Sequence, residues 1–253
     1  MDYNKLQFFI VPANMPPHFE NRNLHNHSYN HYKNSWERIL NRPGRESLFK
    51  PDEFLRQDYV FQVMNGEEVV CQILGTHYHL ESTLTYDLSY FQNFKSDALA
   101  VLQSENIKKL MSLEYSSIKR EYSPKYVDGI NFGEVITYLG IEYAKHLGVE
   151  VILGMPRRVT GTNERVVNSG FRRVKSNLSK CNVTVDVTLG FINEIIEHPD
   201  RKTQFLISKL WNERNDLLGY SKNDLAKNFN YYGKNINKQM SFERDEPILQ
   251  EAL

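Results

Sequence analysis

The sequence predicts an α/β (α+β) fold, with a mixed, mostly antiparallel sheet of about six or seven strands flanked by helices. Three observations support this prediction. An Asn65-Gly66 pair, the strongest short signal for a hairpin turn, separates two β-rich segments. Residues 132–147 have the apolar spacing of an amphipathic helix, and a strand-like run at 149–154 follows at once. Residues 182–189 alternate between apolar and polar side chains, as a half-buried strand does.

The composition of the 253 residues is that of an ordinary folded protein, because 40% are hydrophobic and 25% are charged. The 31 Lys and Arg residues balance the 31 Asp and Glu residues. A nonspecific nucleic-acid-binding protein normally carries a basic excess, so we expect no nucleic-acid partner. Cys71 and Cys181 are too few for a disulfide framework and lack the spacing of a zinc or redox motif.

No part of the sequence is typical of a membrane or secretory segment. The chain has no apolar run close to the roughly 20 residues that cross a bilayer. The initial stretch MDYNKLQFFIVPANMPP lacks the basic region and full apolar region of a signal peptide. We therefore expect a cytoplasmic protein with no membrane span.

Residues 1–50 are expected to form a polar lead-in with one short helix near Ser35–Leu40. His27 and His31 would share one face of a helix, which leaves a metal site open as an interpretation. This Asn-rich setting offers them no evident carboxylate or cysteine partner. We therefore predict no metal.

Residues 51–192 are expected to form the folded core. Tyr59–Met64 and Val69–Leu74 are the two strands of the hairpin. His77 and His79 continue the second strand on one face. They either line a site or are ordinary partly buried residues.

The second half of the core is expected to contain a strand at Leu110–Ile118 and the helix at Phe132–Leu147. Before them, the segment 84–94 is either a strand or a loop, and 96–106 reads as a helix. Asn131 is the expected N-cap of the long helix. The strand–helix–strand order predicts a right-handed crossover between two parallel strands.

The last part of the chain is expected to be helical at first and then polar. A short helix at Thr162–Ser169 precedes the final strand. Residues 193–253 are expected to form a C-terminal extension, with a helical pattern that is broken at Pro199 and a loose tail.

The turn before the long helix is a candidate anion site. Free N–H groups and the positive end of the helix dipole favour a phosphate at such a place. Gly129 and Gly133 have no side chains, so a pyrophosphate could approach the backbone there. Together with Asn131 and Phe132 they are the candidate cofactor-binding residues. The alternative is an ordinary helix start with incidental glycines.

Three stretches and the order of elements resemble the GNAT superfamily of acyltransferases: LEYSSIKREY, DGINFGEVITYLGIEYAKHLGVEVILG and TNERVVNSGFRRV. This resemblance covers residues 113–174 well and implies an enzyme that moves an acyl group from a thioester to an amine. Of the three positions of the family's pyrophosphate signature, only Gly133 matches. Asp128 and Asn131 replace the other two.

Part of the pattern resembles a narrower branch, the acyl-homoserine-lactone synthases and N-acyl amino acid synthases. Their fourth strand often reads Glu, any residue, Ser, Arg, and here it reads Glu114-Tyr115-Ser116-Ser117. The resemblance implies an acyl-CoA or acyl carrier protein as donor and a small-molecule amine as acceptor. Val166 stands where many superfamily members have a Tyr that protonates the leaving thiolate, so that role is vacant or filled by another residue.

The resemblance also suggests which residues carry the reaction. Glu114 is the first candidate for the base that accepts the amine proton, with His77 or His79 as the backup. The alternative is a structural carboxylate that pairs with a nearby cation: Lys119, Arg120 or Arg173.

The donor is expected in the gap between the two central parallel strands. The backbone of Ser116, Ser117 and Ile118 would pair with its pantetheine arm as with an extra strand. Two rival functions stay open at this point. One is an ordinary acetyl-CoA-dependent N-acetyltransferase, and the other is a catalytically inactive GNAT-like scaffold that binds a protein partner.

Overall fold

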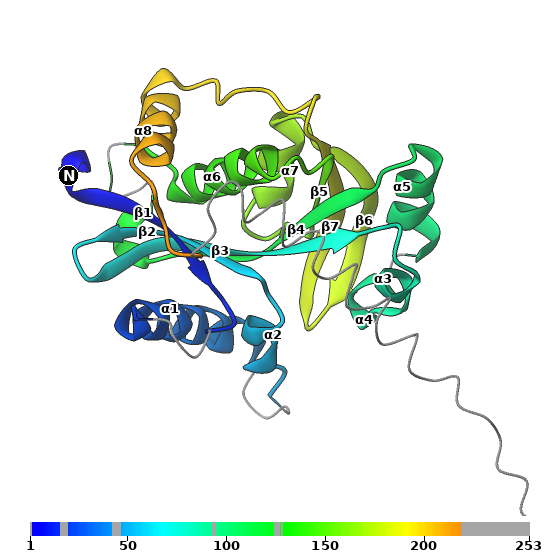
Figure 1. Ribbon diagram of the computed structural model, residues 1–253, viewed down its shortest axis with the longest axis horizontal. Helices are drawn as coiled ribbons and strands as arrows, with labels where there is room; N and C mark the ends of the chain where they lie inside the picture. The colour runs from blue at the N-terminus through cyan, green and yellow to red at the C-terminus, as the bar shows by residue number, and fades with distance from the viewer. Residues whose placement is uncertain are drawn as a thin grey trace, which may run out of the picture. The chain divides into compact units, whose positions relative to one another are not determined.

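A sheet of eight strands is the centre of the fold (Figure 1). The computed structural model describes residues 2–15, 20–41, 47–92, 95–123, 127 and 129–218. The strand order is β6-β7-β5-β4-β3-β2-β1-β8, with parallel pairs at β4–β5 and β1–β8 and antiparallel pairs elsewhere. The strands are β1 (Leu6–Pro12), β2 (Tyr59–Asn65), β3 (Glu68–His79), β4 (Lys109–Ile118), β5 (Val151–Gly154), β6 (Arg172–Lys180), β7 (Val183–Phe191) and β8 (Asn215–Asp216). The predicted fold class is therefore confirmed.

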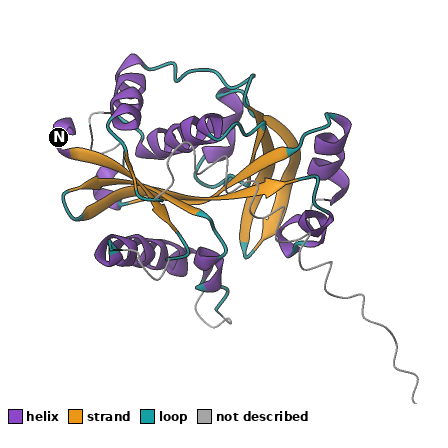
Figure 2. Cartoon of the chain, viewed as in Figure 1, coloured by secondary structure: helices purple, strands orange, loops and turns teal. Residues whose placement is uncertain are grey.

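Helices cover both faces of this sheet. Figure 2 shows α6 and α8 on one face and α1 and α2 on the other. The α-helices are α1 (Arg22–Leu40), α2 (Asp52–Leu55), α3 (Thr83–Asp87), α4 (Ser89–Gln92), α5 (Ala100–Ser104), α6 (Phe132–His146), α7 (Thr162–Asn168) and α8 (Arg201–Asn212). All of these elements belong to one unit, Met1–Asp216, and Leu217–Leu253 form a second unit. Among the described residues, no helix is long and apolar enough to cross a membrane.

Helix α6 begins and ends as its sequence predicts. The Asn131 side chain accepts a hydrogen bond from the Gly133 backbone N–H at 3.0 Å, which caps the first turn. Gly148 follows the helix with a φ of +67°, a conformation that glycine adopts without strain. The helix buries one long face against β2, β3 and β4. The first turns of this helix line the cavity that opens between β4 and β5.

A bulge in β4 separates this strand from β5. Tyr115 has a φ of +55°, and two residues of β4, Tyr115 and Ser116, lie opposite one residue of β3, since Leu74 faces Glu114 and Gln72 faces Ser117. The pairing of β4 with β5 ends at Leu113 and Gly154. Beyond this point the two parallel strands part.

The prediction that residues 1–50 form a polar lead-in with one short helix is wrong. Leu6–Pro12 form a strand inside the sheet, and α1 begins at Arg22 instead of near Ser35. The buried stripe of α1 contains polar residues, so its hydrophobic pattern is weak: His25, Ser28, Tyr32, Trp36 and Leu40.

The segment 84–94 is neither of the two expected alternatives. It contains the short helices α3 and α4, whose aromatic residues join the core, for example Tyr90 and Phe91. The helices expected at 96–106 and 162–169 are confirmed, and α8 begins after Pro199. Asp128, residues 93–94 and the tail from residue 219 lie outside the described residues.

Gly190 of β7 lies directly beside the buried ring of Phe171. A Cβ atom at Gly190 would lie 2.5 Å from Phe171 Cε1 and 2.6 Å from its Cζ. Gly190→Ala is therefore expected to lower the free energy of unfolding by about 1–3 kcal/mol, because the ring must move within a packed core. Urea unfolding measures the change, and an unaltered midpoint would contradict this close packing.

Candidate active site

A cavity of about 660 Å³ opens where β4 and β5 part. It has residues of α6 and α7 on one side and of α1 and α2 on the other, so it passes through the sheet between the two strands. Leu113 packs against Gly140 of α6, whereas the next residue, Glu114, faces Arg56 at the end of α2. This volume is ordinary for a site that binds a small molecule.

Only part of the predicted cofactor-binding set reaches the cavity. Ser116, Ser117, Ile118 and Gly133 line it. The other three predicted residues are not among its described lining residues. Phe132 is fully buried, the Asn131 side chain caps the Gly133 N–H, and Gly129 forms a turn with a φ of +77°.

The two histidines are placed away from the cavity. His77 pairs with Met111, one residue out of phase with Ser112, so alternation puts His77 and His79 on the opposite face of the sheet from Glu114. Their rings contact each other at 4.7 Å. Burial lowers the pKa of His77 to about 4. Neither residue is among those that line the cavity, so the geometry does not support the backup role.

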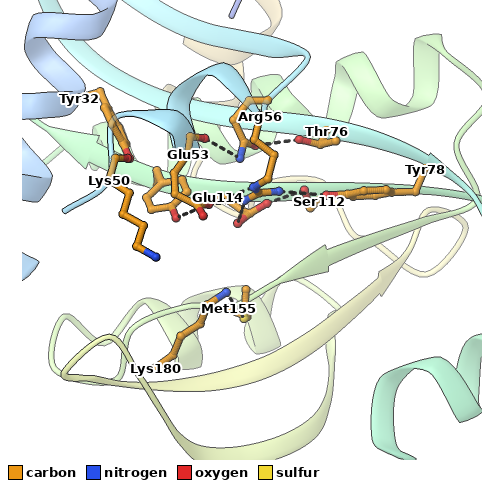
Figure 3. A network of polar contacts seen from close by, with 12 residues as sticks. Tyr32, Lys50, Glu53, Arg56, Thr76, Tyr78, Ser112, Glu114, Met155 and Lys180 are labelled. Atoms are coloured by element: carbon orange, nitrogen blue, oxygen red, sulfur yellow. Dashed lines mark hydrogen bonds and ion pairs between the residues drawn. The ribbon is translucent and has the colours of Figure 1, made fainter. Parts of the chain in front are cut away.

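Glu114 belongs to a buried polar network (Figure 3). Its Oε2 accepts a hydrogen bond from Arg56 Nη2 at 3.0 Å, and its Oε1 accepts one from Ser112 Oγ at 2.9 Å. Arg56 Nε also donates to Glu53 Oε2 at 3.0 Å. The alternative that Glu114 is a structural carboxylate paired with a cation is therefore correct about the pairing. It is wrong about the cation, which is Arg56, 58 residues earlier in the chain.

The bulge turns Tyr115 towards α1. Its ring contacts those of Tyr32 and Trp36, with centroids 5.4 Å and 5.2 Å away, and its hydroxyl donates to Glu53 Oε2 at 3.1 Å. Trp36 Nε1 donates to the Tyr115 carbonyl oxygen at 2.9 Å. These contacts fix the irregular part of β4 beneath α1, where it forms one wall of the cavity.

No protein-family model matches the chain, and no curated protein matches it. Solved structures do resemble it. FeeM, an N-acyl amino acid synthase from uncultured soil microbes, is 14% identical over 75% of this chain and 91% of its own, with a TM-score of 0.53. BjaI, a CoA-dependent acyl-homoserine lactone synthase solved with SAM and isopentyl-CoA, is 13% identical over 88% of this chain and 98% of its own, with a TM-score of 0.51. A Drosophila melanogaster polyamine N-acetyltransferase is 9% identical over 74% and 99%, with a TM-score of 0.51.

The chain has a GNAT fold. The resemblance seen in the sequence is confirmed at this level, including its parallel central strands. Val166 lies on α7 and lines the cavity. An apolar side chain there supplies no proton.

Cations outnumber carboxylates on the cavity wall of this GNAT fold. The carboxylates among its lining residues are Glu53, Glu114 and Glu134. The cations are twice as many: Arg38, Lys50, Arg56, Arg157, Arg165 and Lys180. This excess favours a ligand with an anionic part, such as a phosphorylated donor.

Two of these cations, Arg56 and Lys180, are site residues that the sequence analysis missed. Arg56 follows Glu53 by three residues, a spacing that favours an ion pair but gives no sign of Glu114 as the second partner. Lys180 stands at the end of a polar strand, and only the folded sheet brings it to Met155, 3.5 Å from its Nζ.

The histidine-rich segment is used for packing in this fold. His27 Nδ1 contacts the Glu67 carbonyl oxygen at 2.8 Å, and His25 Nε2 contacts the Ala13 carbonyl oxygen at 2.9 Å. Among the described residues, no group of three or more His, Cys, Asp or Glu side chains is arranged to hold a metal ion. His18 lies outside these residues.

Proposed function

We propose that this protein is an N-acyltransferase that moves an acyl group from a thioester to an amine. The observation that carries the proposal is the cavity that passes between β4 and β5. A thioester that enters from the α6 side and an amine that enters from the α1 side would meet within this gap. Such a meeting converts a reaction between two molecules into one within a single complex.

The donor would occupy the gap and the apolar part of the cavity. Ser116, Ser117 and Ile118 lie on the part of β4 that has no pairing with β5. Because no β5 residue pairs with it there, this backbone could bond an extended pantetheine arm. The acyl chain would then lie against apolar lining residues: Leu113, Ile152, Met155, Phe171 and Val185.

Glu114 would bind and orient the amine. Each carboxylate oxygen can accept two hydrogen bonds, so Glu114 can still accept an N–H beside its bonds to Arg56 and Ser112. The charge-assisted hydrogen bond from Arg56 Nη2 at 3.0 Å would hold this carboxylate in position for the amine.

Ligand-dependent thermal unfolding tests this proposal. The arms are acetyl-CoA, a long-chain acyl-CoA, an acylated carrier protein, free CoA and no ligand. A ligand that binds only the folded state adds about 2.7 kcal/mol of stability at a hundredfold excess over its Kd. Amide formation from the same donors and a pool of amines is followed by mass spectrometry.

A matched pair of variants shows whether binding occurs in the cavity. Val166→Trp fills the cavity from α7, whereas Val159→Trp adds the same ring at a residue that is 82% exposed and is not among the lining residues. We expect only Val166→Trp to abolish the stabilisation. The absence of both stabilisation and amide with every thioester would overturn the proposal, and an effect of acetyl-CoA alone would favour an ordinary acetyltransferase.

A further inference from the structure

The Lys180 side chain reaches into the cavity from the end of β6. Its Nζ lies 3.5 Å from the Sδ of Met155, and Met155 follows Gly154, the last β5 residue that pairs with β4. The amine therefore lies where the two strands part. Figure 3 shows it across an opening from the pair formed by Glu114 and Arg56.

A thioether and an aromatic ring are the immediate neighbours of this amine. Besides the Met155 thioether, Nζ contacts the ring of Tyr90, with the centroid 5.2 Å away. Among the residues that the structure describes, no carboxylate lies within ion-pair distance of Lys180. The ring of Tyr90 favours the ammonium, whereas burial removes water from it and disfavours the charge.

Burial is the largest effect on this amine, and it lowers the pKa of Lys180. The positive charge of Arg56 acts in the same direction. The acidic groups that face Lys180 act against this shift without reversing it: Glu114, Cys181 and Glu53. The neutral amine is therefore more accessible near neutral pH than that of an exposed lysine.

Several other titratable groups are ion-paired, lie outside the cavity or stay protonated. Glu114 is held in its ion pair, and the two histidines of β3 lie on the other face of the sheet. Burial raises the pKa values of Tyr32, Tyr90 and Tyr115, so these phenols stay protonated. The Val166 side chain has no group that accepts or donates a proton.

We propose that Lys180 transfers the proton in the acyl-transfer reaction, an inference that rests on the proposed function. Its neutral amine accepts a proton from the attacking nitrogen as the C–N bond forms. The C–S bond then breaks, the electron pair leaves with sulfur, and the Lys180 ammonium delivers the proton to the thiolate. Nitrogen loses one proton and sulfur gains one, so Lys180 returns to its neutral form.

Lys180→Met and Lys180→Arg test this role against Lys33→Met, which removes an exposed charge of α1 outside the cavity lining. Arginine keeps the positive charge but releases no proton at assay pH. We expect both Lys180 variants to lose about 100-fold or more in kcat while they still bind the thioester, because general acid–base catalysis contributes about that much. Lys33→Met should retain the wild-type kcat.

The pH dependence separates proton transfer from charge. The wild-type rate should rise with pH through the pKa of Lys180, below the usual lysine value of about 10.4. This rise should be absent from both variants. Full activity of Lys180→Arg would show that Lys180 supplies only charge and would overturn the proposal.

A second measurement is independent of catalysis. The rate at which an amine-reactive reagent labels Lys180 is measured against pH by peptide mass spectrometry, with Lys33 as the reference in the same sample. We expect a lower midpoint for Lys180, and equal midpoints would overturn the proposal. A wild-type protein that forms no amide would overturn the proposed function, whereas an active wild type with an active Lys180→Arg variant would overturn only the role of Lys180.

Discussion

Replacing Asp186 with Asn is expected to lower the free energy of unfolding by about 3 kcal/mol, the typical cost of breaking a buried ion pair. The side chain of Asp186 is 0% exposed. Arg158 Nη1 and Arg173 Nε each lie 3.0 Å from one of its oxygens. Asn163 Nδ2 and the Asn177 backbone N–H also donate to it at 3.0 Å. An amide cannot satisfy four donors, and two guanidinium groups lose their partner.

The same variant should alter the acid sensitivity of the protein. Burial alone would raise the pKa of Asp186, but the hydrogen bonds from Asn177, Asn163 and Arg158 outweigh it and hold the pKa below its usual value. A depressed pKa stabilises the fold above the unfolded-state value of about 3.9, and this stabilisation is lost as pH falls through the folded-state pKa. The difference between wild type and Asp186→Asn should therefore shrink in acid.

Urea unfolding at neutral pH and at about pH 3 measures both effects. Asp2→Asn is the control, because Asp2 is half exposed, and its ion pair with Lys5 at 4.0 Å should contribute little. A stability of Asp186→Asn within about 0.5 kcal/mol of wild type, the range of ordinary surface substitutions, would show that this network is dispensable.

Local sequence signals predicted those elements whose stability is mainly local. The hairpin was found from its Asn-Gly pair, although the two turn residues are Gly66 and Glu67, because Asn65 still pairs with Glu68 and only Gly66 has a positive φ, of +60°. The stripe of α6 is apolar enough to identify its face. The N-terminal part of α1 was missed because Ser28 occupies a core position, where its hydroxyl lies within hydrogen-bond distance of the Gln62 side chain and the Leu24 carbonyl oxygen. A search for apolar periodicity does not recognise a buried hydroxyl group whose hydrogen bonds are satisfied.

The only residues of the candidate site that could be predicted are those that lie close together in the sequence. Glu114 and Ser116–Ile118 lie on one irregular strand, so a resemblance in that strand was sufficient to find them. Arg56 and Lys180 reach the same cavity from elements 58 residues before and 66 residues after Glu114. Pairings over such distances depend on the register of the whole sheet, which one sequence does not specify.

Replacing Glu114 with Leu is expected to destabilise the protein by about 3 kcal/mol, because Arg56 loses one of its two carboxylate partners inside a largely buried network and keeps only Glu53. The double variant Arg56→Met/Glu114→Leu should regain most of this stability, since the apolar pair removes the guanidinium that Glu53 alone would have to balance. Glu53 keeps its hydrogen bond from Tyr115 at 3.1 Å in the double variant. Urea unfolding of the wild type, Glu114→Leu, Arg56→Met and the double variant gives the coupling between the two side chains.

The catalytic activity of these variants should not recover together with their stability. If Glu114 binds the amine, both the single and the double variant lose about 10- to 100-fold in kcat/KM, because a hydrogen bond to a charged group contributes about 1.5–3 kcal/mol. Glu114→Gln is the conservative variant, and it should retain the fold while it weakens this bond. A double variant that regains both stability and activity would instead make Glu114 a purely structural partner of Arg56. In that case the amine must be held elsewhere on the cavity wall, and Glu134, the remaining carboxylate of the lining apart from Glu53, is the residue to replace next.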